Sequence, residues 1–170
     1  MFLLDANIFV EAKNRYYGFD FAPGFWTWLE LAHKHNLVCS IEEVKKELHV
    51  VDDELSNWAQ INCEFFREID TATTQHFSTL ISWASTRDYS QSAQAEFASG
   101  NADFLLISYA KEHSLTLVTH EKSSPSSKKR ILIPDACAAM DVRVSNTFEM
   151  LRHSGARLGL LGSSQIHPLK

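Results

Sequence analysis

Four acidic side chains stand at positions where the sequence suggests metal chemistry. They are Asp5, Glu47, Asp103 and Glu121. Asp5 directly follows the apolar run Phe2–Leu4, and Glu121 comes two residues after the apolar run that ends at Thr119. Hard divalent cations such as Mg²⁺ and Mn²⁺ prefer oxygen ligands, keep several waters and bridge to phosphate groups. A cluster of carboxylates would therefore suit hydrolysis of a phosphodiester by metal-activated water.

Each of these acids also has an ordinary structural explanation. Asp5 could cap the turn formed by Asp-Ala-Asn. Asp103 falls in the first turn of a predicted helix, where the helix dipole favours an acid. Glu121 could be an exposed loop residue. Only the four together, in this order along the chain, point to a cation site.

Glu47 is the acid for which the sequence offers the weakest purely structural explanation. On a helical wheel it lies at the margin of the apolar stripe that contains Val44, so we expect its carboxylate to be partly desolvated. That position is costly unless a cation or hydrogen bonds compensate. Glu43, by contrast, fits a capping box with Ser40, in which it reaches back to the start of the helix.

The elements that must position these acids alternate between short apolar strands and amphipathic helices. Strands are expected at 2–4, 37–39, 65–69 (near a sheet edge), 115–119, 131–133 and 142–144. Helices are expected at 23–35, 40–50, 53–61, 73–86, 101–113 and 147–153, with turns or a short helix between 87 and 100. This order favours a parallel sheet covered on both faces, with sites at the carboxyl ends of the strands near the switch point in strand order.

Size and composition fit one cytoplasmic domain. The chain has 170 residues, a formal net charge of -5 and 45% hydrophobic residues. We expect the domain to span 1–153 and the Gly-containing end, 154–170, to be a tail. Its three cysteines form no metal or disulfide pattern and are expected to be buried thiols in a reducing compartment. No signal peptide or membrane span is expected.

The motifs around the four acids resemble those of a known family. Leu3-Leu4-Asp5-Ala6-Asn7 resembles the opening motif of PIN domains, and Glu47-Leu48 resembles their second motif. Ala102-Asp103-Phe104-Leu105 and Val118-Thr119-His120-Glu121 resemble the third and the fourth. The run from 2 to 153 is more closely similar to the PIN-like family DUF4411, also through the segments 53–58 and 133–137.

The resemblance implies a fold, an activity and partners. The fold is a PIN-like three-layer α/β/α sandwich with a central, mostly parallel sheet of four to five strands. The activity is that of a Mg²⁺- or Mn²⁺-dependent ribonuclease, often the toxin of a bacterial toxin–antitoxin pair, and PIN proteins often form homodimers. Asp5 and Asp103 would ligate metal, with Glu47 and Glu121 as ligands or orienters of the attacking water and Asn7 hydrogen bonding near Asp5. Many PIN domains carry Asp where this chain has Glu121, which puts a direct metal contact there in doubt.

The strongest basic run follows a polar loop and could contact the RNA backbone. It consists of Lys128, Lys129 and Arg130. Solvated loop charges are the alternative explanation for this run.

Two other functions compete with the nuclease. One is a catalytically inactive PIN-like module that binds or regulates. The other is a haloacid-dehalogenase-like phosphatase, which requires a second Asp two residues after the first. Asn7 occupies that position, so the phosphatase is disfavoured.

Overall fold

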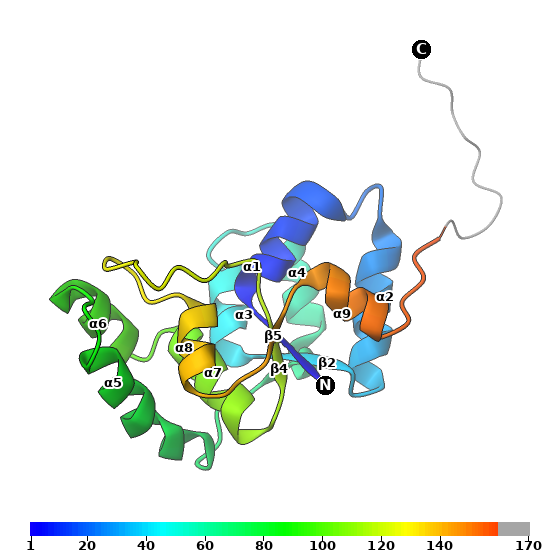
Figure 1. Ribbon diagram of the computed structural model, residues 1–170. Coiled ribbons are helices and arrows are strands. Elements are labelled where there is room, and N and C mark those ends of the chain that lie inside the picture. Colours follow the sequence, from blue (N-terminus) through cyan, green and yellow to red (C-terminus); the bar gives the residue numbers. More distant parts are fainter. Residues whose placement is uncertain (160–170) are drawn as a thin grey trace.

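A five-stranded sheet forms the centre of the protein, whose computed structural model describes residues 1–159 (Figure 1). The strands are β1 (Phe2–Leu4), β2 (Val38–Ile41), β3 (Phe66–Arg67), β4 (Thr116–Val118) and β5 (Val144–Ser145). Their order in the sheet is β3-β2-β1-β4-β5, and every neighbouring pair is parallel. The prediction of a parallel sheet is confirmed, and 65–69 was correctly predicted to contain an edge strand.

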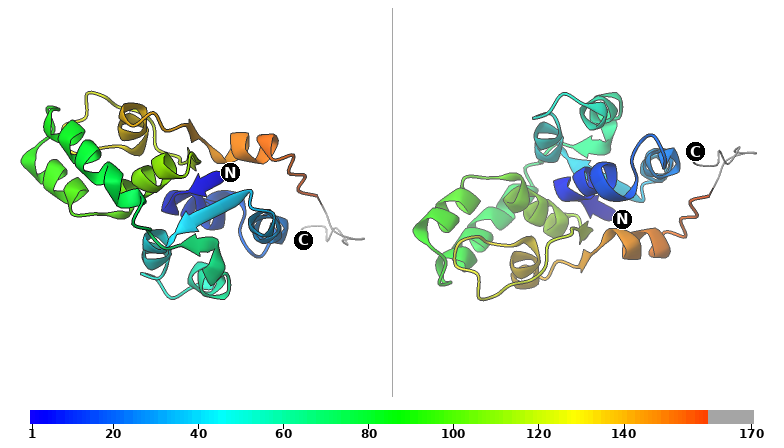
Figure 2. Two further views of the ribbon diagram at one scale, coloured as in Figure 1. Left: turned by 90° about the horizontal axis from the view of Figure 1, so that it is seen from below. Right: turned by 90° about the horizontal axis from the view of Figure 1, so that it is seen from above.

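Helices connect these strands. They are α1 (Ala6–Glu11), α2 (Pro23–Lys34), α3 (Glu42–Leu48), α4 (Glu54–Ile61), α5 (Phe77–Ser85), α6 (Gln91–Ala98), α7 (Ala102–Glu112), α8 (Ile133–Ala139) and α9 (Thr147–His153). A π-helical turn, Ala12–Tyr16, extends α1, and short 3₁₀ turns cover Cys63–Phe65 and Thr73–His76. Figures 1 and 2 show helices packed around the sheet, with α5 and α6 at the opposite end of the molecule from α2 and α9.

The central strands are apolar because both of their faces are covered. Leu3, Leu4, Leu117 and Val118 are fully buried. Strands of a parallel sheet buried on two sides form continuous apolar runs rather than alternating ones. This is why three residues of β1 suffice to define a central strand, and why the first polar residue after them, Asp5, lies at the sheet's carboxyl edge.

The strand order creates a switch point between β1 and β4. From β1 the chain moves outward to β2 and β3, and it then returns to place β4 on the other side of β1. The backbone N–H of Asp5 donates to the carbonyl of Val118 at 3.1 Å, so the ends of the two strands are held together. In open α/β sheets such a switch point is where ligands bind.

The segment 131–133 was wrongly predicted as a strand. Ile133 is instead the first residue of α8, and Pro134 occupies its first turn, where the missing N–H of proline costs nothing. Ile131 and Ile133 are both buried, so the apolar pattern was correct and only its assignment to a strand was wrong. The region 87–100, for which turns or a short helix were expected, contains α6, and Ser90 caps that helix by accepting from the N–H of Ala93.

The predicted capping box at Ser40 and Glu43 is also wrong. Ser40 lies inside β2, and its hydroxyl donates to the carbonyl of Leu4 on β1 at 2.6 Å. The helix therefore begins two residues later, at Glu42, with no side-chain cap. Glu43 forms an ion pair with Lys46 one turn along α3 at 3.4 Å.

Three further expectations concern less regular features. Cys39 and Cys137 are buried as predicted, but Cys63 is exposed. No helix within 1–159 is both long and apolar enough to cross a bilayer. The domain was expected to end at 153, where α9 ends, and most of the expected tail (160–170) lies outside the described residues.

We expect Ser40→Ala to lower the free energy of unfolding by about 1 kcal/mol, because it removes a buried hydrogen bond between two central strands. Chemical denaturation of Ser40→Ala, Glu43→Ala and the double variant would measure this. The two effects should add within about 0.5 kcal/mol, since the residues share no contact. A coupling free energy larger than this would support an interaction between Ser40 and Glu43, as in a capping box.

Candidate active site

A cavity of about 360 Å³ opens where β1 and β4 end. The four predicted acids all line it, although they come from four separate segments of the chain. The polar lining residues are Asp5, Asn7, Glu47, Glu96, Asn101, Asp103, Glu121 and Arg130. The structure thus brings together acids that are up to 116 residues apart in the sequence, at the switch point of the sheet.

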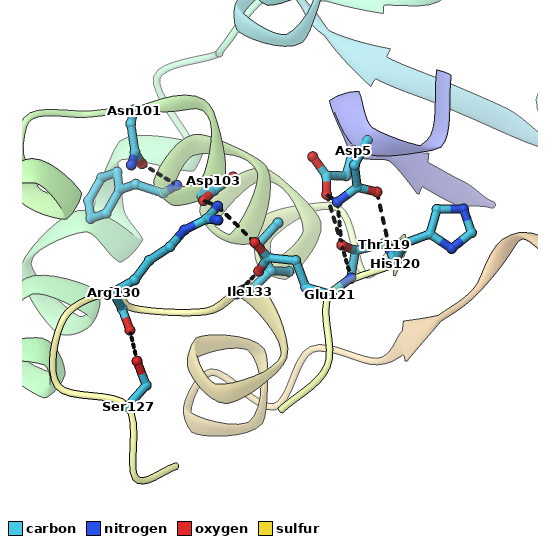
Figure 3. A network of polar contacts seen from close by, with 11 residues as sticks. Asp5, Asn101, Asp103, Thr119, His120, Glu121, Ser127, Arg130 and Ile133 are labelled. Atoms are coloured by element: carbon cyan, nitrogen blue, oxygen red, sulfur yellow. Dashed lines mark hydrogen bonds and ion pairs between the residues drawn. The ribbon is translucent and has the colours of Figure 1, made fainter. Parts of the chain in front are cut away.

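Asp5 is the buried centre of a hydrogen-bond network (Figure 3). Its side chain accepts the hydroxyl of Thr119 at 2.8 Å and the side-chain N–H of Asn7. Asn7 also donates to the Thr119 hydroxyl oxygen at 3.1 Å and accepts the backbone N–H of His120 at 3.1 Å. The same hydroxyl oxygen accepts the N–H of Glu121 at 3.1 Å. The residues after β1 and β4 therefore form one unit that fixes the Asp5 carboxylate.

Burial changes the acidity of Asp5. Only 5% of the residue is exposed, and this desolvation raises the pKa of its carboxyl group from 3.8 to about 7. The negative charges of Asp103 and Glu121 also raise it, while the hydrogen bond from Thr119 lowers it. A carboxyl group with such a pKa gains much by facing a cation, because a cation stabilises the charged form.

Arg130 links two of the other acids. Its Nη2 lies 3.2 Å from Oδ2 of Asp103 and 2.7 Å from Oε1 of Glu121 (Figure 3). The second oxygen of Glu121 accepts the backbone N–H of Ile133 at 2.8 Å, at the start of α8. Burial raises the pKa of both carboxyl groups, and Arg130 opposes this rise.

Asp103 is positioned by the start of α7. It is the second residue of that helix, and Asn101 caps the helix by accepting the N–H of Phe104 at 3.0 Å. The dipole of α7 therefore stabilises the negative charge of Asp103, as the structural explanation of this acid requires. The side chain nevertheless points at the cavity and at Arg130.

Glu47 lies on α3 at the mouth of the cavity. The residue as a whole is exposed, but its carboxyl group is partly desolvated, as predicted for the margin of the apolar stripe. The protein that surrounds its carboxyl group still raises the pKa, as does the charge of Asp103. Within 1–159 its carboxylate makes no hydrogen bond or ion pair, so it is available to a ligand.

The oxygen atoms that line the cavity are of the chemical type that binds hard divalent cations. Carboxylate oxygens from both sides of the cavity are the ligands that Mg²⁺ and Mn²⁺ prefer. Among residues 1–159, however, no three His, Cys, Asp or Glu side chains already form a group that would hold one ion. Asp103 and Glu121 each direct one oxygen to the guanidinium of Arg130 instead.

The basic run divides between two places. Arg130 lines the cavity, whereas Lys128 pairs with Asp88 and lines a neighbouring cavity of about 640 Å³ on the other side of the loop. Lys129 is exposed and makes no ion pair within the described part of the chain. His120 points away from the acids and contacts Thr147 at 3.1 Å.

Sequence reasoning missed Thr119 and Glu96 as residues of this site. Thr119 was placed at the end of a predicted strand and within the fourth PIN-like motif, but it was given no role in the site. A buried hydroxyl directly after a central strand could have been matched with Asp5 after the neighbouring strand. Glu96 lies on α6, and its charge raises the pKa of Asp103. The surrounding sequence has too weak an apolar pattern to have fixed that helix.

Asp5 should make the metal-free protein less stable as the pH rises. The folded state holds this proton up to about pH 7, whereas the unfolded chain releases it near 3.8, so stability falls between these values. Asp5→Asn should remove this part of the slope and be more stable than wild type at about pH 8 by roughly 2–4 kcal/mol. Thermal or urea unfolding between about pH 4 and 8 in EDTA would measure it.

The matched control is Asp141→Asn. Asp141 is exposed at the loop before β5, near the amino ends of the strands, and its positive φ of 53° suits Asn. This variant should keep the wild-type slope. An Asp5→Asn variant no more stable than wild type at high pH would contradict the assigned burial cost.

Comparisons with known proteins identify the fold and the family. The protein shares its fold with VapBC2 from Rickettsia felis, solved bound to a DNA fragment from its promoter, with a TM-score of 0.54 and 18% identity over 85% of this chain and 97% of that chain. FitAcB from Neisseria gonorrhoeae gives a TM-score of 0.52 and 18% identity over 87% of this chain and 99% of that one. No curated protein matches the sequence.

The sheet of five parallel strands with flanking helices confirms the PIN-like three-layer sandwich expected from the motifs. The family model described as "Domain of unknown function (DUF4411)" matches residues 2–158. This chain therefore belongs to the DUF4411 family and has a PIN-like fold.

Proposed function

We propose that this protein is a metal-dependent ribonuclease that uses Mg²⁺ or Mn²⁺, and that it is the toxin of a type II toxin–antitoxin pair. The observation that carries the nuclease proposal is the meeting of Asp5, Glu47, Asp103 and Glu121 in one cavity at the switch point of the sheet. The stability of the fold gives no reason for these acids to face one another. The mutual repulsion of the four acids and the burial of Asp5, Asp103 and Glu121 are costs that a bound cation would offset.

Each acid has a role in this proposal. Asp5 and Asp103 are the metal ligands, since Asp5 is held between β1 and α1, Asp103 is held in the first turn of α7, and both face the cavity. Glu47 and Glu121 are ligands or orient the attacking water. The bound ions would activate that water and stabilise the leaving oxygen of the phosphodiester.

Asn7 and Thr119 act on Asp5 rather than on the substrate. Their hydrogen bonds hold the carboxylate in one orientation and lower the cost of its charge. Partners that orient a ligand in this way tune its affinity for metal. Asn7 also disfavours the phosphatase alternative on chemical grounds, because an amide does not supply the carboxylate of the second Asp in that mechanism.

RNA binding must be local in a protein whose formal net charge is -5. The loop that carries Lys128, Lys129 and Arg130 borders the acidic cavity and supplies the cations for phosphate contacts in our proposal. Lys129 is the most available of the three. Lys128 and Arg130 are engaged in ion pairs, which substrate or metal would have to displace.

The toxin proposal rests on the resemblance to PIN domains and on the fold shared with VapBC2 and FitAcB. It implies an antitoxin protein as a partner, a homodimer of this chain, and a cytoplasmic location. Light scattering of the purified protein would measure the dimer directly.

One observation favours the alternative of a non-catalytic module. Arg130 already neutralises part of the acidic cluster, so the cluster could be stable without metal. A module of this kind would keep its acids without cleaving RNA, and a cleavage assay separates the two.

Wild-type protein with Mn²⁺ or Mg²⁺ should cleave RNA, and Asp5→Asn and Asp103→Asn should each lower the rate at least about 100-fold. Loss of a ligand should exceed the 10–100-fold cost of losing a residue that only orients one. Cleavage of several unrelated RNAs, with EDTA as the metal-free control, is the measurement.

Asp141→Asn again provides the matched control, because it makes the same chemical change at the other edge of the sheet. It should cleave at the wild-type rate. Absence of cleavage by wild type on all RNAs, or equal cleavage by the two site variants and wild type, would refute the nuclease.

Expression of the wild-type chain in a bacterial host should arrest growth if the protein is a toxin, because RNA cleavage would halt protein synthesis. Asp5→Asn and Asp103→Asn should restore growth, while Asp141→Asn should not. Colony counts after induction, normalised to protein level, would measure this. Normal growth with active wild-type enzyme would refute the toxin role and leave the nuclease intact.

A further inference from the structure

We infer that Arg130 is the resident counter-ion of the acidic cavity, which bridges Asp103 and Glu121 in the metal-free protein and competes with a divalent cation for the same oxygens. The inference rests on the proposed function in that it takes this cavity as the metal site. It assigns a role in metal loading to a residue that the motifs would place only in a basic loop.

The geometry puts one nitrogen of Arg130 between two candidate ligands. Nη2 is 2.7 Å from Oε1 of Glu121 and 3.2 Å from Oδ2 of Asp103. These carboxylates come from different elements, α7 and the segment after β4, and the guanidinium links them (Figure 3). A metal ion that used the same oxygens would have to displace this contact.

The two acids are fixed, whereas the arginine can leave. The side chains of Asp103 and Glu121 are 18% and 12% exposed, and the side chain of Arg130 is 59% exposed. Glu121 is also held by the N–H of Ile133 at 2.8 Å. Arg130 therefore reaches the acids from the solvent side on a long, flexible stem.

The backbone that carries Arg130 is anchored independently of its side chain. The carbonyl of Arg130 accepts the hydroxyl of Ser127 at 2.9 Å, and the carbonyl of Lys128 accepts the N–H of Ser90 at 2.7 Å. The guanidinium can therefore move to solvent without rearrangement of the loop, and it stays tethered at the rim of the cavity.

Charge balance gives the exchange its direction. Asp5, Asp103 and Glu121 line one cavity and carry the same sign of charge when ionised, so the metal-free cavity benefits from the one positive charge that contacts two of them. A divalent ion supplies two charges and more ligand bonds. The free energy of breaking the Arg130 contacts is then subtracted from that of metal binding, because the two events are linked.

The test is a calorimetric titration of Mn²⁺ into the metal-free, full-length protein. Arg130→Gln should bind Mn²⁺ about 3- to 10-fold more tightly than wild type, given the modest strength of a partly exposed ion pair. Arg130→Lys keeps the charge but loses the planar fork, so its affinity should lie between the two. Lys129→Gln removes a charge from the same loop without touching the acids, and its Mn²⁺ affinity should stay within about twofold of wild type.

Thermal unfolding provides a readout independent of activity. In EDTA, Arg130→Gln should unfold at a lower temperature than wild type, because the acids lose their counter-ion. Saturating Mn²⁺ should raise its unfolding temperature by more than it raises that of wild type.

Two outcomes separate this inference from the proposed function. If wild type binds Mn²⁺ and Arg130→Gln binds it equally or more weakly, Arg130 is not a competitor, and the metal site stands. If no variant with intact acids binds Mn²⁺, the metal site and the inference both fall.

Discussion

The burial of one carboxylate at the junction of two central strands governs this structure. Asp5 follows a strand that is covered on both faces, so its side chain must lie where water is scarce and charge is costly. Thr119 and Asn7 reduce that cost by donating to it from the end of β4 and the start of α1. The same contacts tie the two strand ends together at the switch point. The interaction that makes Asp5 tolerable therefore also builds the floor of the cavity.

The other acids of the cavity make the charged form of Asp5 still less favourable. Asp103 and Glu121 face Asp5 with the same sign of charge, and their presence raises its pKa further. A protein selected only for stability would be better served by neutral residues here, because buried like charges destabilise the fold. The arrangement is reasonable if a cation binds in the cavity. In the metal-free protein the partly exposed guanidinium of Arg130 supplies one positive charge there. Stability, metal loading and the proposed cleavage of RNA thus depend on one local balance of charge.

The contacts of Glu121 give a structural reason for a side chain longer than Asp at this position. Where many PIN domains have Asp, this chain has the longer Glu, whose two oxygens contact Ile133 at the start of α8 and Arg130 in the preceding loop. The additional methylene carries the carboxylate to these partners. Glu121 thereby couples the loop and α8 to the strand end, which a shorter acid at the same backbone position would do less well.

The sequence by itself determined the parallel sheet and the set of acids. Continuous apolar runs such as Leu3-Leu4 and Leu117-Val118 admit few interpretations, and strand-end positions put Asp5 and Glu121 at one edge. Local patterns were ambiguous where a neighbouring strand decided the outcome. Ser40 looked like a helix cap because a capping box is a local pattern, but a long-range hydrogen bond to Leu4 keeps it in β2. Only the tertiary structure showed that Thr119 supports Asp5 and that Arg130 lies between Asp103 and Glu121, because these contacts join segments whose distance in space is set by the packing of the whole sheet.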